Sequence, residues 1–197
     1  MKKKSLALVL ALAMIVVCVV GGTLAWLTAT TGSVTNTFTY GDINIKLEET
    51  DATAAADGSA TKEFKMIPGY TIAKDPKVTV LAGSEKCYLF VKVDKSTNFD
   101  TFMTYTMETG WTQLKDASEN PVPGVFYRIV DTADMGTAYS VLANDQVTVS
   151  DDVTKGMLNN LTENTYPTLT FTAYACQYMK NNTDSFTAAE AWAKVYP

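Results

Sequence analysis

The residues that most often perform catalysis are limited in this chain by the complete absence of histidine. Without an imidazole, the Ser-His-Asp and Cys-His arrangements and the zinc sites that use histidine are excluded. No glycine-rich phosphate loop with its lysine occurs. A glycosidase would need only two carboxylates, but nothing in the sequence singles out such a pair. We therefore expect a protein that is not an enzyme and uses no cofactor.

Oxygen-rich stretches that could bind calcium are the next candidates. The run 94–100 supplies several side-chain oxygens, and smaller acidic groups occur at Asp131, Asp134 and 151–152. None of them has the ligand spacing or the central glycine of an EF-hand loop. Turn formation and capping explain acidic residues in loops equally well. We predict no metal site, and weak calcium binding stays open.

Cys87 and Cys176 each lie in a segment where apolar and polar residues alternate as in a β-strand. Cys87 shares its face with Leu89 and Val91, whereas Cys176 lies on the face opposite Phe171. Because side chains alternate strictly along a strand, the two thiols should point to opposite sides of their sheets. We therefore predict two free thiols and not a disulfide.

The elements that would position these residues are predicted to be mostly strands. Short runs rich in Val, Thr, Tyr and Phe, separated by turns, favour an antiparallel β-sandwich with jelly-roll or Greek-key wiring over residues 42–197. We expect strands at 42–48, 72–73, 78–81, 87–94, 102–107, 125–130, 139–142, 146–149 and 169–177. In the first strand Ile43, Ile45 and Leu47 should point inward. Pro121 and Pro123 should interrupt the chain.

Other segments of the domain are predicted to be turns, loops and short helices. Residues 49–65 read as an exposed loop, and Pro68-Gly69 as a turn. A weak helix is expected at 152–161. Thr187 and Glu190 form a capping box that should begin a short C-terminal helix.

The N-terminal residues 1–25 have the pattern of a signal-peptide helix. Three lysines precede an uncharged apolar run, and Thr23-Leu24-Ala25 places small residues before a cut between Ala25 and Trp26. The alternative is a retained anchor, since Ser5–Leu27 could just span a bilayer of roughly 30 Å. We expect a secreted, extracellular protein. An uncleaved signal segment would be its only contact with the membrane.

The charge of the expected mature chain limits its partners. Removal of residues 1–25 takes away three of the 16 basic residues and none of the 21 acidic ones, which leaves 13 against 21 and a net charge of −8. Such a balance argues against nucleic acid and anionic membrane surfaces as partners.

Several motifs resemble those of the Gram-positive exported proteins that include TasA and camelysin (CalY). The resemblance rests on Gly21–Leu27 (GGTLAWL), on Phe38-x-x-Gly41-x-Ile43-x-Ile45, on the turn segment Ile67–Pro76, and on Leu169–Gln177. Residues 95–165 match only in their general β character. The resemblance implies processing by a SipW-type signal peptidase, a jelly-roll β-sandwich, and a place in the cell-surface biofilm matrix. The metallopeptidase activity assigned to camelysin gains no support, because the chain has no His-Glu-x-x-His motif.

The same resemblance implies self-association into fibres by donor-strand exchange, with other matrix proteins as further partners. The N-terminal segment 26–41 is the candidate donor, and Val34, Phe38 and Tyr40 are its candidate assembly residues. Trp26–Thr39 carries no charge and no proline, which suits a strand added to a neighbouring sheet. Pairing within its own chain, or a loose tail, stays open.

Two further hypotheses differ from a fibre subunit. A monomeric secreted adhesin or carbohydrate-binding β-sandwich would use the exposed aromatic residues and loops. A hydrolase built on carboxylates alone is the most distant alternative.

Overall fold

A computed structural model describes residues 41–55 and 59–196 of the chain. Within these residues the protein is mostly β, with several antiparallel sheets. The predictions for the signal segment and the candidate donor strand, among them Ala25, Trp26, Val34, Phe38 and Tyr40, lie outside the described residues. In the described part, no helix combines the length and the apolar character that a membrane crossing requires.

The first layer contains two three-stranded sheets. One has the order β1-β5-β10 and the other β4-β11-β7. Their bounds are Ile45–Glu48 for β1, Thr71–Ala73 for β4, Lys77–Val80 for β5, Met103–Thr104 for β7, Ala138–Ser140 for β10 and Gln146–Val149 for β11.

Backbone hydrogen bonds join these two sheets. Lys74 N–H donates to the Asp145 carbonyl at 2.8 Å, and Val141 N–H donates to the Pro76 carbonyl at 2.9 Å. The segment that follows β7 also continues the pairing, because Met107 forms a β-bridge with Leu142. The two sheets therefore form one layer. Its segments lie side by side in the order β1, 71–80, 138–149 and 103–108, with β1 at one outer edge.

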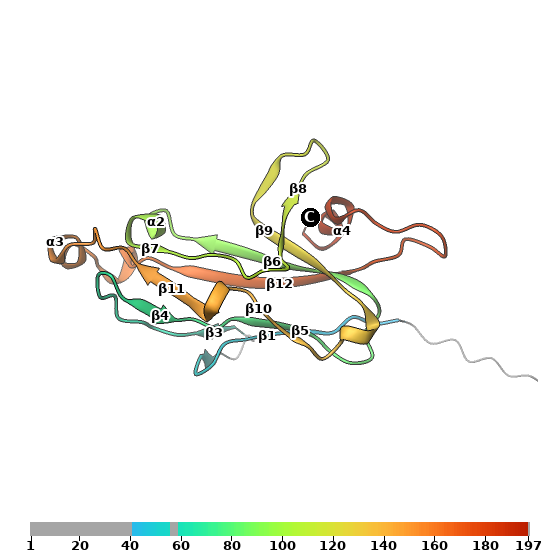
Figure 1. Cartoon of the computed structure of the whole chain (residues 1–197), viewed down its shortest axis with the longest axis horizontal. Helices are drawn as coiled ribbons and strands as arrows, with labels where there is room; N and C mark the ends of the chain where they lie inside the picture. Colours follow the sequence, from blue (N-terminus) through green and yellow to red (C-terminus); the bar gives the residue numbers. More distant parts are fainter. Residues whose placement is uncertain (1–40, 56–58, 197) are drawn as a thin grey trace, which may run out of the picture. The chain divides into compact units, whose positions relative to one another are not determined.

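The second layer is a four-stranded sheet with the order β12-β6-β9-β8. Its strands are β6 (Cys87–Lys95), β8 (Thr112–Lys115), β9 (Pro121–Val130) and β12 (Leu169–Gln177). β6 and β12 pair over their full lengths, from Leu169↔Lys95 to Gln177↔Cys87. Figure 1 shows β4, β5, β10 and β11 together on one side of β6 and β12, with α4 and β8 on the other.

The main hydrophobic core fills the space between the layers. It contains residues of β5, β6 and β9, and it receives partly buried side chains from β1, β10 and β12. In β6 the residues at alternate positions, Cys87, Leu89, Val91 and Val93, all join this core. The predicted inward faces of β6 and β12 are thus confirmed.

A second apolar cluster covers the other face of the four-stranded sheet. Helix α4 (Ala188–Val195) packs Trp192 against Phe90 of β6, with 5.3 Å between the ring centroids. The capping box predicted for this helix is present, since Thr187 and Glu190 bond each other's backbone N–H. Hydrogen bonds from Lys180 and Thr187 lower the pKa of Glu190 to about 2. Because both faces of β6 are covered, five consecutive residues at its start are buried.

Short elements complete the described part. A small hairpin pairs β2 (Thr53–Ala54) with β3 (Ala60–Thr61), and the short helices are α2 (Phe99–Phe102) and α3 (Lys155–Asn159). Single 3₁₀ turns occur at Thr132–Asp134, Ala143–Asp145 and Glu163–Thr165. The turn predicted at Pro68-Gly69 is confirmed: Tyr70 N–H bonds the Ile67 carbonyl at 3.0 Å, and Gly69 has φ of 72°.

Several sequence predictions were wrong in their limits. The first strand begins at Ile45 and not at 42, and Leu47 is 37% exposed because it lies on an edge strand beyond the core. Residues 49–65 contain a hairpin. Pro121 and Pro123 do not break the chain but begin β9, whose pairing there is only with β8, at the edge of the sheet.

Two further limits were also wrong. Residues 99–102 turn into α2, so only Met103–Thr104 remain as strand β7, because the chain must cross here from one layer to the other. The helix expected over 152–161 is shorter, since Thr154 caps it and only Lys155–Asn159 are helical. Strand β8 was not predicted.

Candidate functional site

The two long sides of the paired layers differ. On the closed side, defined here by β1, Glu49, Lys74 and β12, edge strand β1 lies against edge strand β12. A buried ion pair reinforces this side: Lys74 Nζ lies 2.8 Å from Glu49 Oε2, with side chains only 11% and 14% exposed. The Lys74 ammonium also lies 5.4 Å from the ring centroid of Phe171 in β12. This side of the fold is therefore filled.

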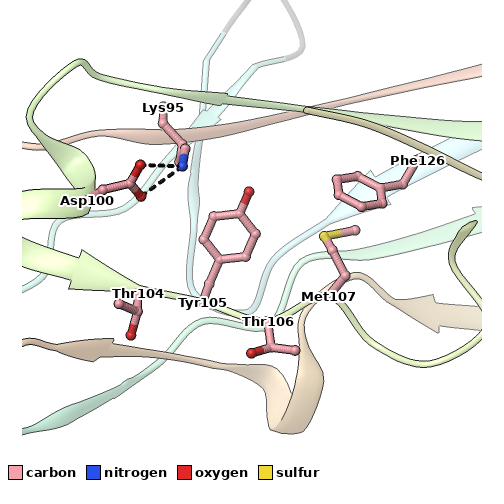
Figure 2. A pocket seen from close by; sticks show the side chains of 7 residues that line it. All are labelled: Lys95, Asp100, Thr104, Tyr105, Thr106, Met107 and Phe126. Carbon is pink, nitrogen blue, oxygen red and sulfur yellow. Dashed lines mark hydrogen bonds and ion pairs between the residues drawn. The ribbon is translucent and has the colours of Figure 1, made fainter. Parts of the chain in front are cut away.

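On the opposite, open side, a hollow of about 410 Å³ lies between the two layers. Figure 2 shows Tyr105 at its centre, Met107 and Phe126 at one end, and the ion pair of Lys95 and Asp100 at the other. The complete lining consists of Lys95, Asp100, Thr104, Tyr105, Thr106, Met107 and Phe126. The hollow thus has an apolar end and a charged end, with Tyr105 between them.

The backbone at this hollow presents an unpaired strand edge. Thr106 accepts from Ala143 N–H and Glu108 N–H donates to Val141, both at 2.9 Å, so these even-numbered residues bond toward the interior of the layer. Because backbone groups alternate in direction along a strand, Tyr105 and Met107 direct theirs to the other side. None of the backbone hydrogen bonds found among the described residues involves these two. They form a free edge beside the hollow.

The course of β9 explains why the second layer does not close this side. Its pairing with β6 ends at Lys92↔Val125, and its first residues pair with β8 instead. Gly124 lies at the change of direction, with φ of 68°, and a Cβ there would lie 2.4 Å from the Val93 carbonyl oxygen. Only glycine fits this approach. The last residues of β6 are thus left without a β9 partner next to the hollow.

The side chains of the hollow are suited to binding rather than to proton transfer. Burial raises the pKa of the Tyr105 hydroxyl, so it stays neutral. The two oxygens of Asp100 lie 2.8 and 2.6 Å from Lys95 Nζ, so that carboxylate is already occupied. A smaller hollow of about 100 Å³ on the other side of segment 104–106 is lined mainly by polar residues.

Three of the six carboxylates considered for calcium are paired with lysines. Asp94 bonds Lys92, Asp100 bonds Lys95, and Asp131 lies 2.7 Å from Lys86. Within residues 41–55 and 59–196, no three His, Cys, Asp or Glu side chains are grouped to hold a metal ion. Asp94, Asp100 and Asp131 therefore serve local ion pairing in the described structure.

The two cysteines lie as their sequence parity predicted. Cys87 belongs to the core between the layers, and Cys176 to the cluster beneath α4, so the thiols lie on opposite faces. Both are free and buried. Burial raises the pKa of the Cys87 thiol to about 11, and that of Cys176 is raised for the same reason. Neither has the lowered pKa that a reactive thiol needs.

Comparison with known proteins gave no match: no family model, no curated protein and no solved structure is similar enough to this chain to be reported as a relative.

Sequence reasoning singled out the run 94–100, which contains Lys95 and Asp100 of the lining, but only as a calcium candidate, and it missed the other residues of the open side. Tyr105, Met107 and Phe126 looked like ordinary strand residues, and their proximity depends on the order of the strands. One feature of the sequence could have drawn attention to this region. Arg128 is the single arginine of the chain, and it lies two residues after Phe126.

Proposed function

We propose that this protein is a secreted structural subunit of extracellular surface or biofilm-matrix fibres, which assemble by addition of the N-terminal strand of one subunit to the next. The observation that carries the proposal is the free edge of Tyr105 and Met107 above the hollow on the open side. An unpaired edge next to an apolar hollow is the arrangement that strand addition requires.

The candidate donor has features that match this acceptor. In an extended Val34–Tyr40 segment, Val34, Phe38 and Tyr40 share one face with Asn36, and three threonines occupy the other face. A strand paired along 103–107 would point every second side chain toward the hollow. Phe38 is then an appropriate side chain to contact Tyr105, Met107 and Phe126, because aromatic rings contribute large apolar contact areas.

The order of the strands supports jelly-roll wiring. Leaving out the small β2–β3 hairpin, the domain has eight extended segments, numbered along the chain: β1, β4–β5, β6, 103–108, β8, β9, β10–β11 and β12. With these numbers the first layer has the order 1-2-7-4 and the second 8-3-6-5. An ideal jelly roll has the orders 2-7-4-5 and 1-8-3-6. The two folds therefore share the runs 2-7-4 and 8-3-6, and they differ only in the positions of segments 1 and 5. Segment 5, which is β8, pairs with segment 6 here and leaves segment 4 (103–108) without its outer neighbour. An added strand would occupy that position.

The mode of assembly follows from the acceptor and the donor being different surfaces. Such a contact is heterologous, and it extends into a filament when the rotation between subunits does not close a ring. The export pattern of residues 1–25 and the resemblance to TasA and camelysin support a location outside the cell and processing by a SipW-type signal peptidase.

Negative-stain microscopy tests the donor. The chain that starts at Trp26 should form fibres, and a chain that starts at Tyr40 should not. If the two chains both remain monomeric under all matrix-like conditions, the fibre proposal is wrong and a monomeric adhesin or sugar-binding module becomes the better explanation.

A proline substitution tests the acceptor. Met107→Pro removes an outward-pointing N–H from the free edge, and Met107→Ala shortens the same side chain but keeps the N–H. We expect the proline variant to lose fibre formation and the alanine variant to retain most of it. Circular dichroism checks that both variants are folded. Equal fibre formation by the two folded variants would exclude segment 103–107 as the acceptor.

A further inference from the structure

Arg128 occupies an unusual place at the border of the open side. It pairs with Leu89 in the β6–β9 register, and Leu89 belongs to the core, so Arg128 projects between the layers. Its guanidinium carbon lies 3.7 Å from the ring centroid of Tyr139 in the opposite layer and 5.3 Å from that of Trp111. The guanidinium is therefore held against two aromatic rings.

No described residue satisfies the hydrogen-bonding capacity of this arginine. Among the described residues it forms no ion pair and no hydrogen bond, and its Nε is buried without a partner. Asp134 influences it electrostatically but lies beyond ion-pair distance. Partial burial lowers the pKa of the guanidinium, because it disfavours the charged form. A buried charged donor without a partner is costly, and an acceptor would remove that cost.

The surroundings fix the guanidinium and keep its outer edge clear. Trp111 is anchored because its Nε1 donates to the Ser140 carbonyl at 2.8 Å. Gly110 has φ of 90°, and a Cβ at this position would lie 3.0 Å from Arg128 Nη2. The terminal nitrogens, unlike Nε, are not among the buried unpaired atoms, so they reach the surface. A fixed pair of N–H groups at the surface matches the two oxygens of a carboxylate.

We propose that Arg128 is a receptor site for a carboxylate group. The source is either an acidic side chain of a second copy of this chain or a small free carboxylate. A second copy can supply this chemistry, because the chain carries 21 acidic residues. That source rests on the proposed fibre function, since Arg128 follows Phe126 of the hollow along the same face of β9. The receptor chemistry itself does not depend on fibres.

Nuclear magnetic resonance can observe this site directly. Because Arg128 is the single arginine, its side chain gives one Nε–Hε signal, which reports on the guanidinium alone. The unassembled protein is titrated with sodium acetate and, as the matched control, with sodium chloride at equal ionic strength. We expect acetate, and not chloride, to shift this signal in a saturable way, with affinity on the order of millimolar.

Two variants distinguish a receptor from a purely structural clamp. Tyr139→Leu keeps Arg128 but removes the ring beneath it, and should weaken the acetate shift severalfold. Because the Trp111 ring lies beside the guanidinium, its indole signal should also respond to acetate in the unsubstituted chain. Arg128→Lys keeps the charge without the planar fork, and should abolish this response. Identical responses to acetate and chloride in the original chain, together with no change of the Nε signal on assembly, would overturn the proposal.

Assembly separates the two sources of the carboxylate. If a second copy supplies it, the Nε signal shifts on fibre formation and the Arg128→Lys variant forms fibres less readily. If a free carboxylate is the ligand, the acetate shift is present and fibre formation is equal in both chains. The acetate result holds even if no fibres form, so failure of the fibre proposal can be told apart from failure of the receptor proposal.

Discussion

On the closed side of the fold, β1 lies against β12 and Glu49 pairs with Lys74 largely shielded from solvent, whereas on the open side the edge of Tyr105 and Met107 borders a hollow. Both sides carry a lysine–carboxylate pair. The Lys95–Asp100 pair of the open side is 34% and 70% exposed, against 11% and 14% for Lys74–Glu49. A buried lysine–carboxylate pair thus stabilises the closed side, whereas an exposed pair of the same kind flanks the open side.

The largest effect is expected from breaking the buried pair of the closed side. Glu49→Gln leaves the Lys74 ammonium buried without a counter-charge and should lower the free energy of unfolding by about 3–5 kcal/mol. Guanidinium chloride denaturation measures this. The double variant Glu49→Gln/Lys74→Met should recover a large part of the loss, because no unpaired charge is then buried. A single-variant loss below about 1 kcal/mol would place the pair with ordinary surface pairs.

Hydrogen exchange should separate the free edge from a strand with neighbours on both sides. The amides of Tyr105 and Met107 should exchange at least about a hundredfold faster than that of Val78 in β5, which lies between β1 and β10. Residue-resolved exchange in the unassembled protein gives these rates. On assembly the two edge amides should become protected. Equal protection of Val78 and the edge amides before assembly would show that the open side is already occupied.

The reactivity of the two thiols compares the core between the layers, which contains Cys87, with the cluster beneath α4, which contains Cys176. In the folded protein both should react slowly with a thiol reagent, since burial raises both pKa values, that of Cys87 to about 11. Cys176 should react severalfold faster, because local opening of the short helix α4 uncovers it while Cys87 lies between the layers. After denaturation without reductant both should react fully. A Cys87–Cys176 bridge in that experiment would refute the placement on opposite faces.

The smallest effect is expected from the exposed pair of the open side. Asp100→Asn should change the free energy of unfolding by no more than about 0.5 kcal/mol, because solvent already screens this pair. The same denaturation experiment as for Glu49→Gln provides the comparison. A loss as large as that of Glu49→Gln would mean that the two sides are equally closed.

The parts of the fold that depend on neighbours along the chain could be predicted from the sequence. Strand β12 was predicted with the limits that the structure shows, Leu169–Gln177. Its nine residues keep one unbroken alternation of apolar and polar side chains, and this alternation fixes which of them point inward. The turn at Pro68-Gly69 and the capping box of Thr187 and Glu190 also follow from local chemistry. Leu47 was misassigned because alternation shows a face but not whether anything covers it.

The candidate site could not be predicted in the same way. Tyr105 and Phe126 line one hollow only because β9 turns away at Gly124 and pairs with β8, which leaves segment 103–108 without an outer neighbour. A pattern of alternating residues does not state which strand lies beside which. The site thus depends on long-range pairing.

The sequence by itself determined most of the long strands, which face of β6 and β12 enters the core, and that histidine chemistry is excluded, because these follow from residue types and a two-residue period. Tertiary structure alone decided that Glu49 and Lys74 are largely buried and that the outward backbone groups of Tyr105 and Met107 have no strand partner among the described residues. It also decided that Arg128 is held against Tyr139 and Trp111 without an acceptor in the described part of the chain. The physical reason is that burial and pairing are properties of neighbours in space, which the order of strands sets and which no local pattern contains.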